Sequence, residues 1–238
     1  MKKLFLIIIL SSLSFAQSSL LTLMSDDALI LPVTANLQFD FDMDYATTAS
    51  VIDLSGNNRT MTFYDTVTVN TAGINSKYKT VTFDGSDDYG KISAFTSNQP
   101  VTLYIVVKGI TLTSNKRIAD GNGLNSNLVS IQAGNAWGIY AGSAYITSAT
   151  EDNLVQGGWC LLTCVYNGAS SIAQRNNGTA KSGSIGTSGA GGFTLAADGN
   201  NASQSNIEVA RVLRYAGAHD EATRTLIKAY LNKKYAIY

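Results

Sequence analysis

The chain has 238 residues, of which 45% are hydrophobic and only 14% are charged, and its 17 basic and 17 acidic residues give a formal net charge of +0. The basic residues form no stripe, which argues against a nucleic-acid partner, because nucleic acids select clustered Lys and Arg. With 21 Gly and only 2 Pro, short apolar runs separated by small polar residues are typical of a β-sandwich rather than a helical protein.

The first 24 residues combine positive charge with a long apolar run. Met1-Lys2-Lys3, apolar residues 4–10 and small residues at Ser14-Phe15-Ala16 predict a signal peptide over residues 1–16, cleaved before Gln17. Apolar residues resume at 20–24, so the stretch reaches the ~20 residues that can span a bilayer, and an uncleaved hydrophobic anchor is the alternative. We therefore expect a secreted or cell-surface protein whose only membrane contact is this segment, with residues 25–238 forming one domain.

Alternating apolar and polar residues predict the first strand at residues 37–42, with the sequence LQFDFD. Asp40, Asp42 and Asp44 then lie at alternate positions, and we expect them on the solvent face of an outer strand. A turn follows at residues 53–58, and two more short strands are indicated around residues 61–63 and 67–69.

The run Thr80–Ile92 has the most informative pattern in the chain. Val81 and Phe83 alternate with threonines, residues 84–87 have the Asp, Gly and Ser of a tight turn, and a second strand begins at residue 89. We therefore predict a hairpin here. Its three aspartates, Asp84, Asp87 and Asp88, offer the hard oxygen ligands that Ca²⁺ prefers, although such side chains also bind turn amides, and calcium is the only cofactor that we consider.

Later strands are predicted at residues 101–108, 127–132, 136–140, 144–147, 159–166, 172–175, 193–196 and 206–215. The strand at 101–108 is apolar throughout and should be buried on both faces. Cys160 and Cys164 would share one face of a strand but lie roughly 13 Å apart. A disulfide needs Cα atoms within about 7 Å. We therefore expect two free, buried thiols.

The C-terminus changes to helical spacing. Apolar residues at 226, 227, 230 and 231 predict a helix from Glu221 to Lys234, with Asp220 as its N-cap and lysines in its last turn.

Three landmarks resemble those of the bacterial laminin-G-like domains in the concanavalin A-like lectin/glucanase superfamily. They are the "D-SGN" loop at residues 53–57, the "FDG-S-DDY" run at 83–89 and the closing helix with its "YL…KY" ending. The resemblance covers residues 37–235 and implies an all-β fold: a two-sheet antiparallel jelly-roll β-sandwich with one C-terminal α-helix. Because that superfamily contains binders, enzymes and structural parts, function must be argued from a site.

The glycoside hydrolases of this superfamily place acidic residues as Glu-x-Asp-x-x-Glu on one strand. The chain has only three glutamates, Glu151, Glu208 and Glu221, and none has a carboxylate two residues away. Its single histidine, His219, precedes the helix cap, and no Ser-His-Asp set is visible. We therefore expect no catalytic residues.

A sugar site needs exposed aromatic rings and neighbouring hydrogen-bonding groups. Trp137, Tyr140 and Tyr145, with Asn135 beside them, lie around Gly-rich turns and are the candidate ligand-binding residues, unless they pack between the sheets. The first hypothesis is a non-catalytic recognition or adhesion module that binds a glycan or cell-surface polysaccharide. The alternative is a structural component, such as a fibre or decoration protein, of an extracellular assembly or a virus particle. Its partners would then be other copies of the chain or other proteins of the virion. A carbohydrate-active enzyme is third.

Overall fold

The computed structural model describes residues 29–238, so the predicted signal peptide and anchor lie outside the described residues. The chain divides into two units, Met1–Pro32 and Val33–Tyr238, and every strand and helix of the described part belongs to the second. No helix within residues 29–238 is both long and apolar enough to cross a membrane.

The first sheet contains eight strands in the order β14-β13-β12-β7-β16-β5-β4, with β1 also paired to β16. Their bounds are β1 Leu37–Asp42, β4 Thr68–Ile74, β5 Tyr78–Asp84, β7 Val101–Thr111, β12 Trp159–Tyr166, β13 Ser171–Arg175, β14 Lys181–Gly183 and β16 Asn206–Ala216. Strand β16 pairs with β7 along one edge, while its other edge pairs first with β5 and then, after an irregularity at Val209–Arg211, with β1.

The second sheet also contains eight strands, in the order β11-β10-β9-β8-β15-β6-β3-β2. Their bounds are β2 Ser50–Val51, β3 Met61–Tyr64, β6 Tyr89–Ile92, β8 Arg117–Asp120, β9 Leu128–Ile131, β10 Trp137–Tyr140, β11 Tyr145–Thr147 and β15 Phe193–Leu195. Within residues 29–238, four short 3-10 turns connect strands: η1 Met43–Tyr45, η2 Ala133–Asn135, η3 Thr150–Asp152 and η4 Gly168–Ser170. This arrangement, with its C-terminal helix, confirms the predicted two-sheet antiparallel sandwich.

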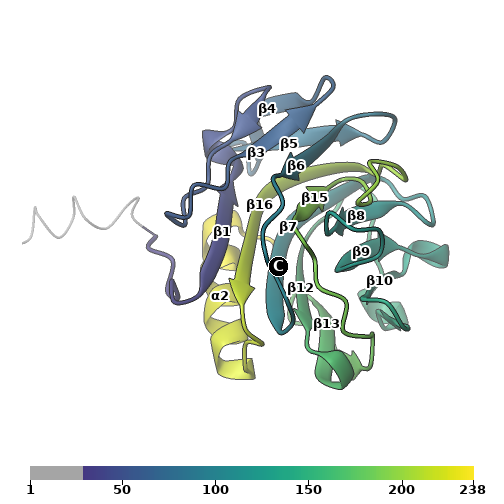
Figure 1. Ribbon diagram of the computed structural model, residues 1–238. Helices are drawn as coiled ribbons and strands as arrows, with labels where there is room; N and C mark the ends of the chain where they lie inside the picture. The colour runs from purple at the N-terminus through teal and green to yellow at the C-terminus, as the bar shows by residue number, and fades with distance from the viewer. Residues whose placement is uncertain (1–28) are drawn as a thin grey trace, which may run out of the picture. The chain divides into compact units, whose positions relative to one another are not determined.

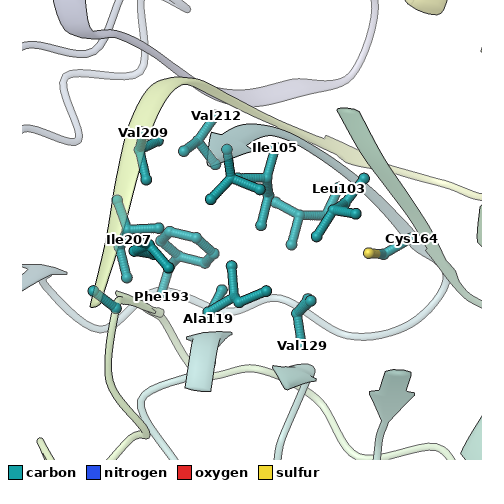
Figure 2. Packing of buried hydrophobic residues seen from close by; sticks show 14 of the residues in the cluster. Leu103, Ile105, Ala119, Val129, Cys164, Phe193, Ile207, Val209 and Val212 are labelled. Carbon is teal, nitrogen blue, oxygen red and sulfur yellow. The ribbon is translucent and has the colours of Figure 1, made fainter. Parts of the chain in front are cut away.

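The core lies between the two sheets. In Figure 2, Leu103 and Ile105 of β7 and residues of β16 face Phe193 of β15, together with Ala119 and Val129. The thiol of Cys164 points into the same layer, and both cysteines are free and buried as predicted. Strand β7 is buried on both faces over most of its length, again as predicted. Burying this apolar surface is the main driving force for joining the sheets.

Helix α2 (Glu221–Tyr235) lies alongside β1 and β16 on the outside of the first sheet (Figure 1). Asp220 is its N-cap, as predicted, and its side chain accepts the Thr223 N–H at 2.8 Å. Its residues Ile227, Tyr230 and Leu231 are buried, which explains their helical spacing.

The expectation that Asp40 and Asp42 face solvent is wrong. Their exposed fractions are 4% and 3%, because α2 covers this face of β1. Arg211 of β16 forms ion pairs with Asp40 at 2.7 Å and with Asp42 at 3.1 Å, and also donates to the Tyr230 hydroxyl at 2.7 Å. Lys234 of α2 completes the network by binding Asp42 and Asp44. The alternating aspartates therefore attach the helix to the sheet.

The predicted hairpin at residues 80–92 is also wrong, although both of its strands exist. Strand β5 belongs to the first sheet and β6 to the second, so the turn between them is a corner that joins the sheets. At this corner Asp88 accepts the Asp84 N–H at 2.8 Å and Asp84 accepts the Ser86 N–H at 2.7 Å. The corner lets one chain segment contribute apolar residues to both layers of the core.

Candidate functional site

The outer face of the second sheet presents aromatic and polar side chains at neighbouring strand positions. Met61 and Phe63 of β3 point into the core, so Thr62 and Tyr64 point outward. By the same alternation, Ile92 of β6 enters the core while Tyr89 and Lys91 point outward.

Tyr64 and Tyr89 form a directly opposed cross-strand pair. Their ring centroids lie 4.7 Å apart and the ring planes differ by only 9°, so the two rings stack. Tyr64 keeps 44% of its surface exposed. Burial raises the pKa of the Tyr89 hydroxyl, and the neighbouring Tyr64 and Asp65 add to that rise. The stacked pair is thus an aromatic surface of the kind that binds a sugar ring.

Lys91 lies two residues farther along β6 on the same face, roughly 7 Å from Tyr89 along the strand. Its ammonium group donates to the Gly199 carbonyl at 3.0 Å and to the Asn201 side-chain oxygen at 2.8 Å. Thr62 of β3 and Thr194 of β15 are its partners on the two neighbouring strands. Aromatic and polar groups therefore occupy adjacent rows of the same face.

Two of the predicted ligand-binding residues form a second tyrosine pair on this sheet. Tyr140 and Tyr145 oppose each other across β10 and β11, with ring centroids 4.9 Å apart and planes inclined by 38°. Ile139 and Ile146 beside them point into the core, so both tyrosines point outward. Tyr145 is 41% exposed. Strands β11 and β10 come at the opposite end of the strand order from β3, and Figure 1 shows β10 far from β3, so this pair is a separate aromatic surface.

The structure does not bring the other two predicted residues to these rings. Trp137 has no exposed surface and lies in the core, where its indole N–H donates to the Asp152 carbonyl at 3.2 Å. Its ring therefore offers no surface for stacking. Asn135 is exposed but lies in η2, at the opposite end of β10 from Tyr140.

The three aspartates considered for calcium lie at the corner between β5 and β6. Asp84 and Asp87 are exposed, whereas Asp88 is 2% exposed. Burial raises the pKa of Asp88 to about 6, although its hydrogen bond from the Asp84 N–H opposes the rise. Within residues 29–238, no three acidic, histidine or cysteine side chains are gathered closely enough to hold a metal ion.

Glu208 is the most enclosed glutamate, and its carboxylate is held by neighbours on the first sheet. It forms an ion pair with Lys108, accepts the Thr80 hydroxyl, and accepts the Asn70 amide at 3.2 Å. The Lys108 ammonium also lies 5.0 Å from the ring centre of Trp159. That ring lies on the strand face opposite Cys160 and is only partly buried. The contacts of Glu208 explain its burial without a catalytic role.

His219 occupies the position before the helix cap, as predicted. Its Nδ1 lies 2.9 Å from the Tyr104 hydroxyl, and its ring centre lies 4.4 Å from that of Tyr215. Burial lowers the pKa of the imidazole, so the ring favours its neutral form. This arrangement packs the start of α2 against the first sheet.

Sequence reasoning did not identify Tyr64, Tyr89 or Lys91 as candidate site residues. A local signal exists, because each residue alternates with a core residue of its strand. Their pairing, however, depends on β3 and β6 being neighbours, and 24 residues of intervening chain include strands of the other sheet. Local periodicity does not specify which distant strands pair.

No family model and no curated protein matches the sequence. Solved structures do match the fold. Domain 4 of AbnA, a GH43 extracellular arabinanase from Geobacillus stearothermophilus solved with arabinotriose, is 16% identical, with a TM-score of 0.62 over 81% of this chain and 97% of that one. The binding domain of Paraclostridial Mosquitocidal Protein 1 is 17% identical, with a TM-score of 0.61 over 83% of this chain and 52% of that one.

Trypanosoma rangeli sialidase is 12% identical, with a TM-score of 0.62 over 86% of this chain. The matched region spans only 34% of the sialidase chain. At these identities the similarities establish a shared β-sandwich fold, and function must be argued from the side chains of this chain.

Proposed function

We propose that this protein is a non-catalytic glycan-recognition module that binds saccharides on the outer face of its second sheet. The stacked Tyr64–Tyr89 pair is the observation that carries the proposal, because it combines a fixed geometry with 44% exposure of Tyr64. The Lys91 ammonium and Asn201 side chain supply adjacent hydrogen-bonding groups. Sugar-binding sites combine exposed aromatic rings with neighbouring hydrogen-bonding groups in this way.

Two further considerations support binding without covalent chemistry. Asp40 and Asp42 form ion pairs with Arg211 beneath α2, and Glu208 forms an ion pair with Lys108, so these carboxylates already have partners within the protein. The structures with a similar fold include an arabinanase domain solved with arabinotriose and the binding domain of a mosquitocidal protein. We also propose that the chain is a secreted laminin-G-like domain, with the motifs at residues 53–57 and 83–89 and the N-terminal pattern as support.

A glycan array probed with the full chain tests this function. Tyr64→Ala removes the exposed ring of the stacked pair, and we expect affinity for the bound glycan to fall about tenfold or more. Tyr45→Ala is the matched control, because Tyr45 is 56% exposed in η1 and takes no part in the pair. Absence of binding to every glycan would contradict the proposal and favour a structural role in an extracellular assembly.

A further inference from the structure

We propose that the saccharide bound at the Tyr64–Tyr89 pair carries a carboxylate, as uronic and sialic acids do, and that Lys91 receives it. This inference rests on the proposed function and specifies its ligand class. It follows from the charge distribution around the two rings, which differs between the two ends of the aromatic surface.

Lys91 provides a positive charge that no side chain of the described residues neutralises by an ion pair. Both acceptors of its ammonium group, the Gly199 carbonyl and the Asn201 amide oxygen, are neutral. An ammonium group has three N–H donors, so one donor and the full charge remain for a ligand. These two hydrogen bonds hold the Lys91 ammonium group in place, which lowers the entropic cost of binding a ligand there.

The loop that contains Gly199 and Asn201 has one carboxylate, that of Asp198, and this group forms hydrogen bonds within its own loop. Asp198 is 5% exposed, and its Oδ1 accepts the N–H groups of Asn200 and Ala202, both at 2.9 Å. It therefore stabilises its own loop, and the loop presents to Lys91 only neutral oxygens.

The opposite end of the tyrosine pair is negative. Asp65 follows Tyr64 directly, is exposed, and contributes to the raised pKa of Tyr89. A carboxylated sugar stacked on the rings is repelled at this end and attracted at the Lys91 end. The face thus selects one orientation: the carboxylate lies toward Lys91 and the hydroxyl groups lie toward Asp65, whose oxygens can accept them.

The test compares saccharides that differ only in their acidic group. Titration calorimetry with the full chain would use polygalacturonate against its carboxyl-reduced form, and sialyllactose against lactose, so that uronate and sialate sources are distinguished. We expect the chain to prefer the acidic member of at least one pair by about tenfold, the effect of one charge-assisted hydrogen bond. The preference should weaken as salt is added.

Two substitutions with opposite expected effects complete the test. Lys91→Met should abolish the preference for the acidic member, whereas Asp65→Asn should strengthen acidic binding severalfold by removing a like charge. Asp65→Asn touches neither the two hydrogen bonds of the Lys91 ammonium group nor the rings, so it remains informative even if Lys91→Met unfolds the loop. Equal binding of acidic and neutral members, or no effect of Asp65→Asn on acidic binding, would overturn this inference and leave the proposed function standing. No binding to any member of either pair would also overturn this inference, and the glycan array would then decide the proposed function separately.

Discussion

At the scale of single residues, Asp88 shows how position determines the chemistry of a carboxyl group. It is 2% exposed at the corner between the sheets, next to the charges of Asp84 and Asp87. Burial is the main reason that its pKa rises from the usual 3.8 to about 6. The same three aspartates suggest a calcium site in the sequence, whereas in the structure Asp84 and Asp88 bind backbone N–H groups of the turn.

This raised pKa predicts that the protein loses stability as the pH rises through the window from about 4 to about 6. In that window the folded state retains a proton on Asp88 that the unfolded chain has released. The free energy of unfolding should therefore fall by about 1–2 kcal/mol across the window, once solvent screening is allowed for. Urea denaturation at both ends of the window measures this change.

Asp88→Asn should reduce that pH dependence, because the amide oxygen can still accept the Asp84 N–H but does not ionise. Asp87→Asn is the control, since Asp87 is exposed and should leave most of the pH dependence in place. If the free energy of unfolding varied with pH in the same way for the wild type and Asp88→Asn, the assignment of this pH dependence to Asp88 would be contradicted.

At the scale of elements, the contact between α2 and β1 depends on buried charge as well as on apolar packing. Arg211 binds Asp40 and Asp42 under the helix, and Tyr230 of α2 accepts a hydrogen bond from the same guanidinium group. Helical periodicity correctly predicted where α2 begins and that Ile227, Tyr230 and Leu231 are buried, whereas Leu226, which shares their spacing, is 55% exposed. It could not show that the aspartates of β1 lie beneath it, because the outward face of a strand looks the same in sequence whether water or a helix covers it.

Arg211→Met should destabilise the fold by about 3–5 kcal/mol, because it leaves the Asp40 carboxylate buried without its cation. Lys234→Met should cost less, since the Lys234 side chain is 12% exposed and Asp42 would still have Arg211. Urea unfolding curves at neutral pH compare the two variants. A smaller loss for Arg211→Met than for Lys234→Met would show that the buried network contributes little.

At the scale of the whole molecule, the two thiols of β12 are enclosed in the core between the sheets, so their reactivity reports on global unfolding. Burial raises the pKa of Cys160 to about 11 and raises that of Cys164 as well. Thiols react as thiolates. We therefore expect neither cysteine to react with a thiol reagent in native buffer and both to react once denaturant unfolds the chain. Rapid labelling of the native protein would mean that the sandwich opens locally at β12.

Several elements follow from the sequence because their causes are local. The strand at 159–166, the helix from Glu221 and its Asp220 cap match the structure, since side-chain alternation, helical spacing and capping act over a few residues. Strand β8 (Arg117–Asp120) was not predicted, because its four residues mix charged and apolar types without a clear alternation.

The sequence by itself therefore determined the all-β class, the two-sheet arrangement expected from the motifs at residues 53–57 and 83–89, the closing helix and the free thiols. Only the tertiary structure decided that residues 80–92 turn a corner between sheets, that Asp40 and Asp42 are buried, and that Tyr64, Tyr89 and Lys91 share one face. The physical reason is that strand pairing and the covering of a face depend on contacts between segments distant in the chain, which local periodicity does not encode.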